Sequence, residues 1–146
     1  MADGPKGETR AALVTGAGRR IGAAIALALA RAGYAVGLHA NNSRDDAERL
    51  AAGIIGTGGQ ARVVLADLAD HDAVRGLVPA AAAFGRLTLL VNNAGEFEPD
   101  DIETLSQARF QRAVAVNLEA PLFLSQAFAS QAPEGLDPSI VNIVDQ

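Results

Sequence analysis

A glycine-rich segment near the amino terminus has the spacing of a phosphate-binding turn. Residues 15–22 read TGAGRRIG. Gly16 would allow a tight turn out of a strand, and Gly22 would let the following helix approach the sheet closely. Free backbone N–H groups and the positive end of the helix would then face a diphosphate. The same residues could form an ordinary strand-to-helix turn, and a βαβ context favours the phosphate-binding interpretation.

The end of the second apolar segment favours a cofactor that carries a 2′-phosphate. An Asp or Glu usually binds the ribose hydroxyls of NAD at this place. Residues 38–43 read LHANNS, and the first carboxylate after them is Asp45. Because an acid would repel a phosphate, its absence leaves room for one, and Arg19 and Arg20 would supply cationic partners. Each arginine could instead be a solvated surface charge. We therefore predict NADP(H) rather than NAD(H).

Polar residues also follow the later apolar segments. Asp67 could accept a hydrogen bond from the adenine amino group, or it could begin a helix. Asn117 lies within the apolar stretch 113–118, where an amide needs partners. A buried asparagine satisfied by backbone groups is the simpler interpretation, and it is compatible with a functional role.

The elements that would position these residues alternate between strand and helix. Strands are predicted at 11–15, 34–39, 61–66, 87–91 and 139–144. Helices are predicted at 21–32, 43–55, 71–84 and 107–129. The second would begin with a capping box of Ser43 and Asp46, and the fourth would be capped by Ser106 and bent at Pro121. The strands are continuous apolar runs, which indicates a parallel sheet covered on both faces. The predicted fold is therefore α/β, a Rossmann-type doubly wound parallel sheet over residues 11–146, with a polar tail over 1–10.

Composition excludes several classes of protein. The 146 residues are 49% hydrophobic, carry a net charge of −5 and include no cysteine. A nucleic-acid or anionic-membrane surface is not favoured, and disulfides, thiolate zinc sites and cysteine nucleophiles are excluded. No signal-peptide core or membrane-spanning run is visible in the sequence. We expect a cytoplasmic protein with a small-molecule substrate, and predict no metal site.

Taken together, these motifs resemble the short-chain dehydrogenase/reductase family. The most specific match is the run 92–95, NNAG, and further matches are Thr15-Gly16 with Gly22, Asp67-Leu68, Asn117 and the run 139–143. The resemblance implies that Asn92 supports the sheet and that Asn117 belongs to the proton-relay region. The residues expected to bind the cofactor are Gly16, Gly18, Arg19, Arg20, Ile21, Gly22, His39, Asn41, Ser43, Asp67, Leu68, Asn93, Ala94 and Gly95.

Within the family, the chain is similar to the pteridine reductases. Arg20 replaces the usual glycine, and Asp145 stands in place of the catalytic serine. Phe97 would then stack a pterin against the nicotinamide, although it could be an ordinary loop residue. Gly95 departs from the serine common in pteridine reductases. Asn42 stands where an arginine often helps to bind the 2′-phosphate, so that recognition would depend more on Arg19, His39 and Ser43.

The resemblance also implies what this chain lacks. The family reduces a C=O or C=N bond by hydride transfer, with a Tyr-x-x-x-Lys pair on the helix after the fifth strand. Here the only tyrosine is Tyr34 and the only lysine is Lys6. Loss of a positioned general acid costs about 10²–10⁴ in rate, so we expect the chain alone to be inactive. The predicted strand 140–144 would also be an open edge, so we expect a carboxyl-terminal part that is absent here. Family members commonly pair through the helix predicted at 107–129, so we expect a homo-oligomer at full length.

Two other functions fit part of the pattern. A non-catalytic module that binds NADP(H) would need the same turn but no proton donor. A methyltransferase also places a glycine-rich turn after its first strand, but it usually has an acid after the second, and the NNAG run argues against it.

Overall fold

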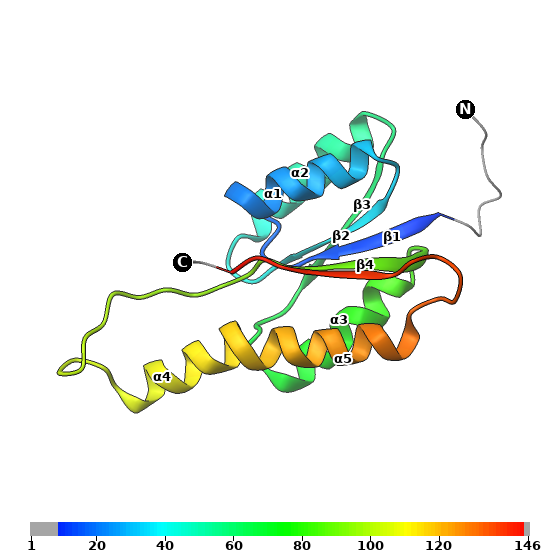
Figure 1. Cartoon of the computed structure of the whole chain (residues 1–146). Coiled ribbons are helices and arrows are strands. Elements are labelled where there is room, and N and C mark those ends of the chain that lie inside the picture. Colours follow the sequence, from blue (N-terminus) through cyan, green and yellow to red (C-terminus); the bar gives the residue numbers. More distant parts are fainter. Residues whose placement is uncertain (1–8, 145–146) are drawn as a thin grey trace.

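The computed structural model, which describes residues 9–144, contains one five-stranded parallel sheet (Figure 1). The strands are β1 (Arg10–Val14), β2 (Ala35–Ala40), β3 (Gln60–Leu65), β4 (Arg86–Asn92) and β5 (Ser139–Asn142), in the order β3-β2-β1-β4-β5. β2 and β3 follow one another on one side of β1, and β4 and β5 on the other side. The direction in which strands are added to the sheet therefore reverses between β1 and β4. Ligands of open parallel sheets bind beside such a reversal, at the carboxyl ends of the strands.

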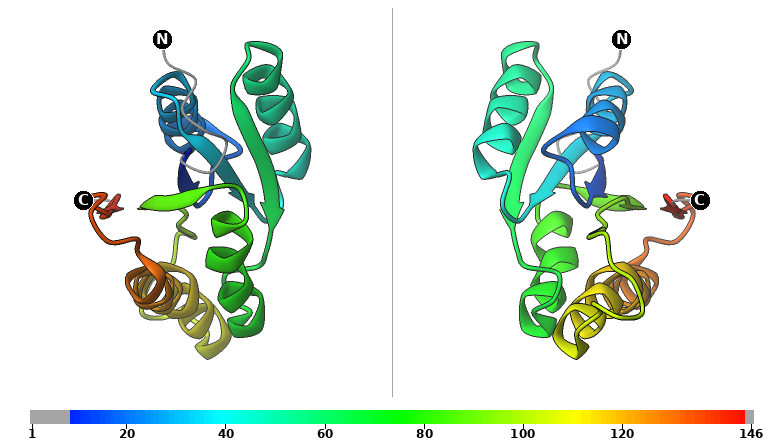
Figure 2. Two further views of the ribbon diagram at one scale, coloured as in Figure 1. Left: turned by 90° about the vertical axis from the view of Figure 1, so that its right-hand side faces the viewer. Right: turned by 90° about the vertical axis from the view of Figure 1, so that its left-hand side faces the viewer.

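Helices cover both faces of the sheet, which confirms the predicted doubly wound fold (Figures 1 and 2). One face carries α1 (Arg20–Arg31) and α2 (Arg44–Gly56), and the other carries α3 (His71–Ala82), α4 (Gln107–Val114), the π-helical turn η1 (Ala115–Glu119) and α5 (Ala120–Gln131). The predicted strands and helices all occur, with ends shifted by one or two residues. Arg10, predicted as the last residue of the tail, begins β1.

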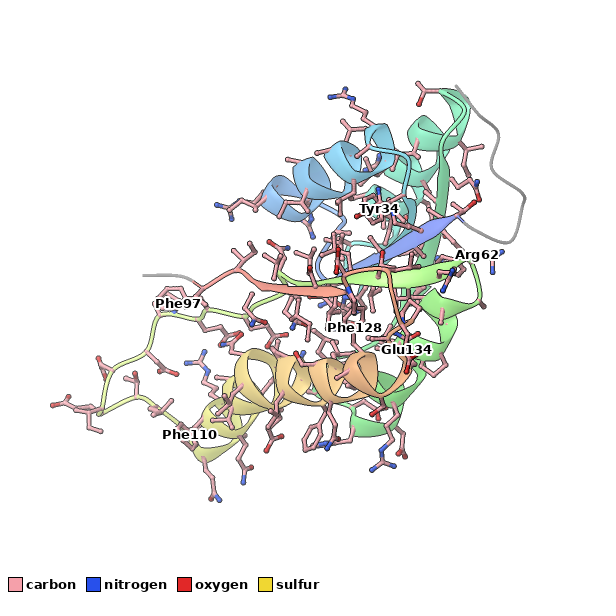
Figure 3. The ribbon with its side chains drawn as sticks, turned by 45° about the vertical axis from the view of Figure 1, so that its right-hand side comes forward. Tyr34, Arg62, Phe97, Phe110, Phe128 and Glu134 are labelled. Carbon is pink, nitrogen blue, oxygen red and sulfur yellow. The ribbon has the colours of Figure 1, made fainter. Side chains whose placement is uncertain are left out.

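Two hydrophobic clusters explain why the strands are continuous apolar runs. Leu13 and Val14, adjacent in β1, are both fully buried, yet they belong to different clusters. Leu13 packs with residues of α3 and α5, among them Phe128, which lies between α5 and the sheet (Figure 3). Val14 packs with residues of α1 and α2. Since successive side chains point to opposite faces, a sheet covered on both sides needs an apolar residue at each position.

The helix predicted over 107–129 is divided by the π-helical turn η1. Pro121 cannot donate the backbone hydrogen bond to the carbonyl of Asn117, and its ring would clash with that carbonyl in a regular α-helix. The wider turn immediately before the proline accommodates this constraint, and α5 begins at Ala120. As a result, Asn117 lies within the π turn, a type of irregularity often found at functional sites.

The predicted capping box at the start of α2 does not form. Ser43 precedes the helix but makes no capping hydrogen bond with its side chain. The Ser43 side chain lies against Gly18, where an added Cβ would collide with it. Asp46 instead pairs with Arg49 and, at 3.1 Å, with Arg19 of the glycine-rich turn. Tertiary contacts have therefore replaced the local cap. The predicted Ser106 cap does form, by accepting a hydrogen bond from Arg109 N at 3.3 Å.

β5 is the last strand of the sheet on the β4 side. Ile140 and Val141 are 39% and 42% exposed, so this strand is less covered than the central ones. In the described part of the chain, no helix is both long enough and apolar enough to cross a membrane.

Candidate cofactor site

A cleft of about 430 Å³ lies at the carboxyl ends of β1 to β4. It is lined by all of the predicted cofactor residues except Gly18, and also by Asn42, Glu96 and Val116. Gly18 lies behind the lining, against Ser43. Four separate loops thus converge on one cleft, and the assignment of these residues to a cofactor stays a prediction at this point.

The glycines of the first turn are required by close contacts. Gly16 has a φ of +62°, and a Cβ there would lie 2.9 Å from Ala94 Cα. A Cβ on Gly22 would collide with the carbonyl oxygen of Gly16 and lie 2.6 Å from Asn93 Nδ2. Because neither glycine has a side chain, the turn can press against the loop after β4.

Arg20 adopts a backbone conformation that favours glycine. Its φ is +53°, in the left-handed region, which costs a residue with a Cβ about 1–2 kcal/mol. Arg19 is held by Asp46, whereas Arg20 forms no ion pair within residues 9–144. A strained arginine that lines a cleft and has no acidic partner there is suited to bind an anion.

Thr15 and Asn93 join the ends of β1 and β4. The Thr15 hydroxyl accepts hydrogen bonds from Asn93 N and Ala94 N, each at 3.0 Å. The Asn93 side chain donates in return to the carbonyl oxygens of Thr15 at 3.0 Å and Gly16 at 3.2 Å. Thr15 is 1% exposed, so its hydroxyl is shielded from water. Thr15 marked the family pattern in the sequence but was not predicted as a site residue, and its contacts are to the protein backbone.

Asn92 ties the neighbouring strands together. Its Nδ2 donates to Asn142 Oδ1 of β5 at 2.8 Å and to Ser125 Oγ of α5 at 3.3 Å. These contacts agree with the sheet-supporting role that the resemblance implied.

His39 is a structural support of the glycine-rich turn rather than a free ligand. Gly16 N donates to its Nδ1 at 3.1 Å, and its Nε2 lies 3.0 Å from the carbonyl oxygen of Ala66. Because an amide only donates and a carbonyl only accepts, the ring must be neutral with its proton on Nε2. Burial lowers the pKa of His39, against a smaller opposing effect of its bond to Ala66. Neither nitrogen is free for the 2′-phosphate contact predicted for this residue.

An arginine that the sequence reasoning missed binds two acids of the cleft. Arg112 of α4 donates to both carboxylate oxygens of Asp67, at 3.1 and 3.2 Å, and to both of Glu96, at 2.8 and 2.6 Å. Asp67 Oδ1 also accepts from Ala69 N at 2.9 Å. The Arg112 bond, followed by the Ala69 bond, lowers the pKa of Asp67. No local pattern predicts this cluster, since Arg112 is 16 residues from Glu96 and 45 residues from Asp67 in the sequence.

The three remaining predicted residues have different positions. Asn117 is exposed rather than buried, and it finds backbone partners in the loop after β4: its Oδ1 accepts from Glu96 N and its Nδ2 donates to Glu96 O, both at 2.8 Å. Phe97 is 86% exposed on the loop between β4 and α4 and does not line the cleft (Figure 3). Asp145 lies outside the described residues.

The Thr15 contacts predict a stability effect. Thr15→Val keeps the shape of the side chain but leaves Asn93 N and Ala94 N without their acceptor, so we expect a loss of about 2 kcal/mol in the free energy of unfolding. Urea unfolding of the intact protein measures this loss. Thr15→Ser, which keeps the hydroxyl, should lose less than about 1 kcal/mol. Equal losses in the two variants would show that packing, and not the hydroxyl, matters.

The neutral state of His39 predicts a pH effect on stability. An unfolded histidine has a pKa of about 6.5, and the pKa of His39 in the fold is lower, so the unfolded chain binds a proton first as the pH falls. The stabilisation is complete above about pH 6.5 and is lost as the pH falls toward the lowered pKa; we expect a loss of about 1 kcal/mol at pH 5.5.

Urea unfolding at pH 7.5 and 5.5 checks this expectation in variants of the two histidines. His39→Asn, which offers an acceptor to Gly16 N but does not titrate, should lose the pH dependence. His71→Asn changes the exposed histidine and should keep it. A pH dependence that follows His71 would contradict the assignment to His39.

Comparison with known proteins places this geometry in a family. The model of the family described as short chain dehydrogenase matches residues 10–145. An oxidoreductase of Methylorubrum extorquens is 42% identical over 137 residues, which are 93% of this chain and 54% of the relative. The chain thus spans about half the length of the curated relatives that it matches.

Two solved structures share both the fold and the sequence pattern. FolM alternative dihydrofolate reductase 1 from Brucella suis, in complex with NADP, is 43% identical with a TM-score of 0.87, over 94% of this chain and 57% of that one. A short chain dehydrogenase from Burkholderia cenocepacia, also in complex with NADP, is 40% identical with a TM-score of 0.87, over 94% and 56% of the two chains. On the fold, the cleft and these matches, the chain belongs to the short-chain dehydrogenase family.

Proposed function

We propose that the cleft binds NADP(H) and that the protein is an NADPH-dependent reductase. The observation that carries this proposal is the end of β2, where the uncharged Asn41, Asn42 and Ser43 line the same cleft as Arg19 and Arg20. No carboxylate of this loop lines the cleft, so a 2′-phosphate would meet amides, a hydroxyl and guanidinium groups. The NADP present in both similar structures supports the proposal.

The residues of this chain would hold the cofactor in three parts. The N–H groups of Gly16 and Ala17 donate to His39, so the diphosphate would be bound through the backbone N–H groups that follow them, from Gly18 to Gly22 at the start of α1. Asp67 and Leu68 would border the adenine, and Ala94 with Gly95 would border the nicotinamide side. The bound cofactor supplies the hydride for the reduction of a C=O or C=N bond.

We further propose a dihydropteridine as the substrate. Two of the features that the chain shares with pteridine reductases lie within the described residues: Arg20, in a strained conformation at the cleft, and Phe97, exposed on the adjoining loop. The similarity to a FolM dihydrofolate reductase agrees with this choice. Gly95 counts against this choice, because pteridine reductases commonly have a serine at this position; an added Cβ would lie 3.4 Å from Asn117 Oδ1, so a serine would fit there.

The single tyrosine of the chain does not supply the proton. Tyr34 precedes β2, and the Arg10 guanidinium lies 4.7 Å from the centre of its ring. Both residues are at the amino ends of their strands, whereas the cleft is at the carboxyl ends. Turnover therefore needs a proton donor other than Tyr34. A module that binds NADP(H) without catalysis remains the second candidate, favoured by the same observation.

Cofactor preference tests the first proposal. Asn41→Asp adds a carboxylate of nearly the same shape beside the proposed phosphate, and we expect the Kd for NADPH to rise by about tenfold through charge repulsion, with little change for NADH. Titration of the intact protein with each nucleotide measures both constants. Gln60→Glu adds the same charge at the amino end of β3 and should change neither. If the ratio of the Kd for NADPH to the Kd for NADH were unchanged in Asn41→Asp, phosphate binding at this loop would be refuted.

Turnover tests the proposed substrate. The full-length protein should oxidise NADPH in the presence of dihydrobiopterin or dihydrofolate. Phe97→Ala should lower kcat/KM by about tenfold, because the stacking of the ring on the substrate is lost. Ile102→Ala, in the same loop and 92% exposed, is the matched control and should leave kcat/KM unchanged. Binding of NADPH without oxidation would support the non-catalytic module instead.

A further inference from the structure

Arg112 connects two sides of the cleft that the chain builds from distant segments. Asp67 follows β3 and lies where the adenine is proposed, whereas Glu96 follows the run 92–95 after β4. The guanidinium bonds to both carboxylates at 3.2 Å or less. Such charge-assisted, bidentate contacts fix both position and orientation. One side chain of α4 therefore holds the two loops at a set separation.

Glu96 is held at its backbone as well as at its side chain. Asn117 of η1 bonds to both the N–H and the carbonyl of Glu96, while Arg112, on the preceding turns of the same helical segment, bonds to its carboxylate. The loop leaves the cleft directly after this residue, toward Phe97. Glu96 is thus the last anchored point before the proposed substrate loop.

The charges of this cluster bear on an anionic ligand. Asp67 and Glu96 both line the cleft, and their side chains are 41% and 38% exposed. Two unshielded carboxylates would oppose a cofactor that carries three phosphate groups. Arg112 offsets one of the two charges and directs both carboxylates toward α4.

We propose that Arg112 is a positioning residue for cofactor binding: it directs the carboxylates of Asp67 and Glu96 toward α4 and offsets one of their two charges, which lowers their repulsion of NADP(H). This inference rests on the proposed binding of NADP(H). It does not require direct contact between Arg112 and the cofactor, and Arg112 does not line the cleft.

Arg109 offers a matched comparison on the same helix. It also bonds to two acids, Glu98 at 3.0 Å and Asp100 at 3.1 Å, and its side chain is 49% exposed against 40% for Arg112. Neither Arg109 nor its partners line the cleft. The two arginines therefore differ mainly in which acids they hold.

The test is the NADPH affinity of the intact protein, measured by titration and independent of turnover. Arg112→Gln should raise the Kd for NADPH by about fivefold. The effect is modest because Arg112 and its two acidic partners are partly exposed. Arg109→Gln should leave the Kd unchanged. Glu96→Gln removes one of the two opposing carboxylates and should lower the Kd, and the double variant Arg112→Gln/Glu96→Gln should recover most of the loss.

The double variant separates shielding from a purely structural role. If Arg112 acted only by holding the two loops rigidly, Glu96→Gln would weaken NADPH binding as Arg112→Gln does, and the double variant would show no recovery. That result overturns the proposal. An unchanged Kd in Arg112→Gln overturns it as well. Arg112→Met, which keeps the stem of the side chain and loses the charge, replaces the Gln variant if that variant does not fold. If the wild-type protein fails to bind NADPH, the proposed function fails together with this inference.

Discussion

The cleft depends on the mutual hydrogen bonding of Thr15 and Asn93. Gly16 can approach Ala94 to contact distance only while the ends of β1 and β4 are held together, and four hydrogen bonds between these two segments hold them. These strands are also the ones between which the order of the sheet reverses. The constraint therefore lies at the place where an open parallel sheet offers a ligand site. His39 links this junction to the second and third strands, because its side chain, on β2, bonds to Gly16 after β1 and to Ala66 after β3.

Features that depend on local sequence were predictable. Continuous apolar runs identified the five strands, because a sheet buried on both faces tolerates few polar residues along a strand. The glycines of the first turn identified its close packing against the neighbouring loops, since their spacing reflects steric limits that a Cβ would violate. Both the fold and most of the lining of the cleft could therefore be derived before the structure.

Features that depend on which residues meet in space were not predictable. The Ser43 and Asp46 pattern is a valid local cap, but Gly18 and Arg19 engage both side chains from another loop. His39 has the type and position of a ligand, and only its two backbone partners show that it is a support. For Arg112, the sequence shows a charge on an amphipathic helix, and such a residue is most often solvated. Its role emerges only when α4 is placed beside the loops after β3 and β4.

Side chains of both charges line the cleft. Arg19 and Arg20 lie beside the end of β2, where a 2′-phosphate is proposed, and the acids Asp67 and Glu96 lie beside the ends of β3 and β4. Arg20 retains a strained backbone where glycine would be relaxed, which is stable only because the surrounding contacts fix the turn. Arg112 of α4 pairs with both Asp67 and Glu96 and offsets one of their two negative charges, which would otherwise weaken the attraction. Arginines thus act in two ways in one site: those at the glycine-rich turn would attract the anion directly, and the one on α4 would limit the repulsion it meets.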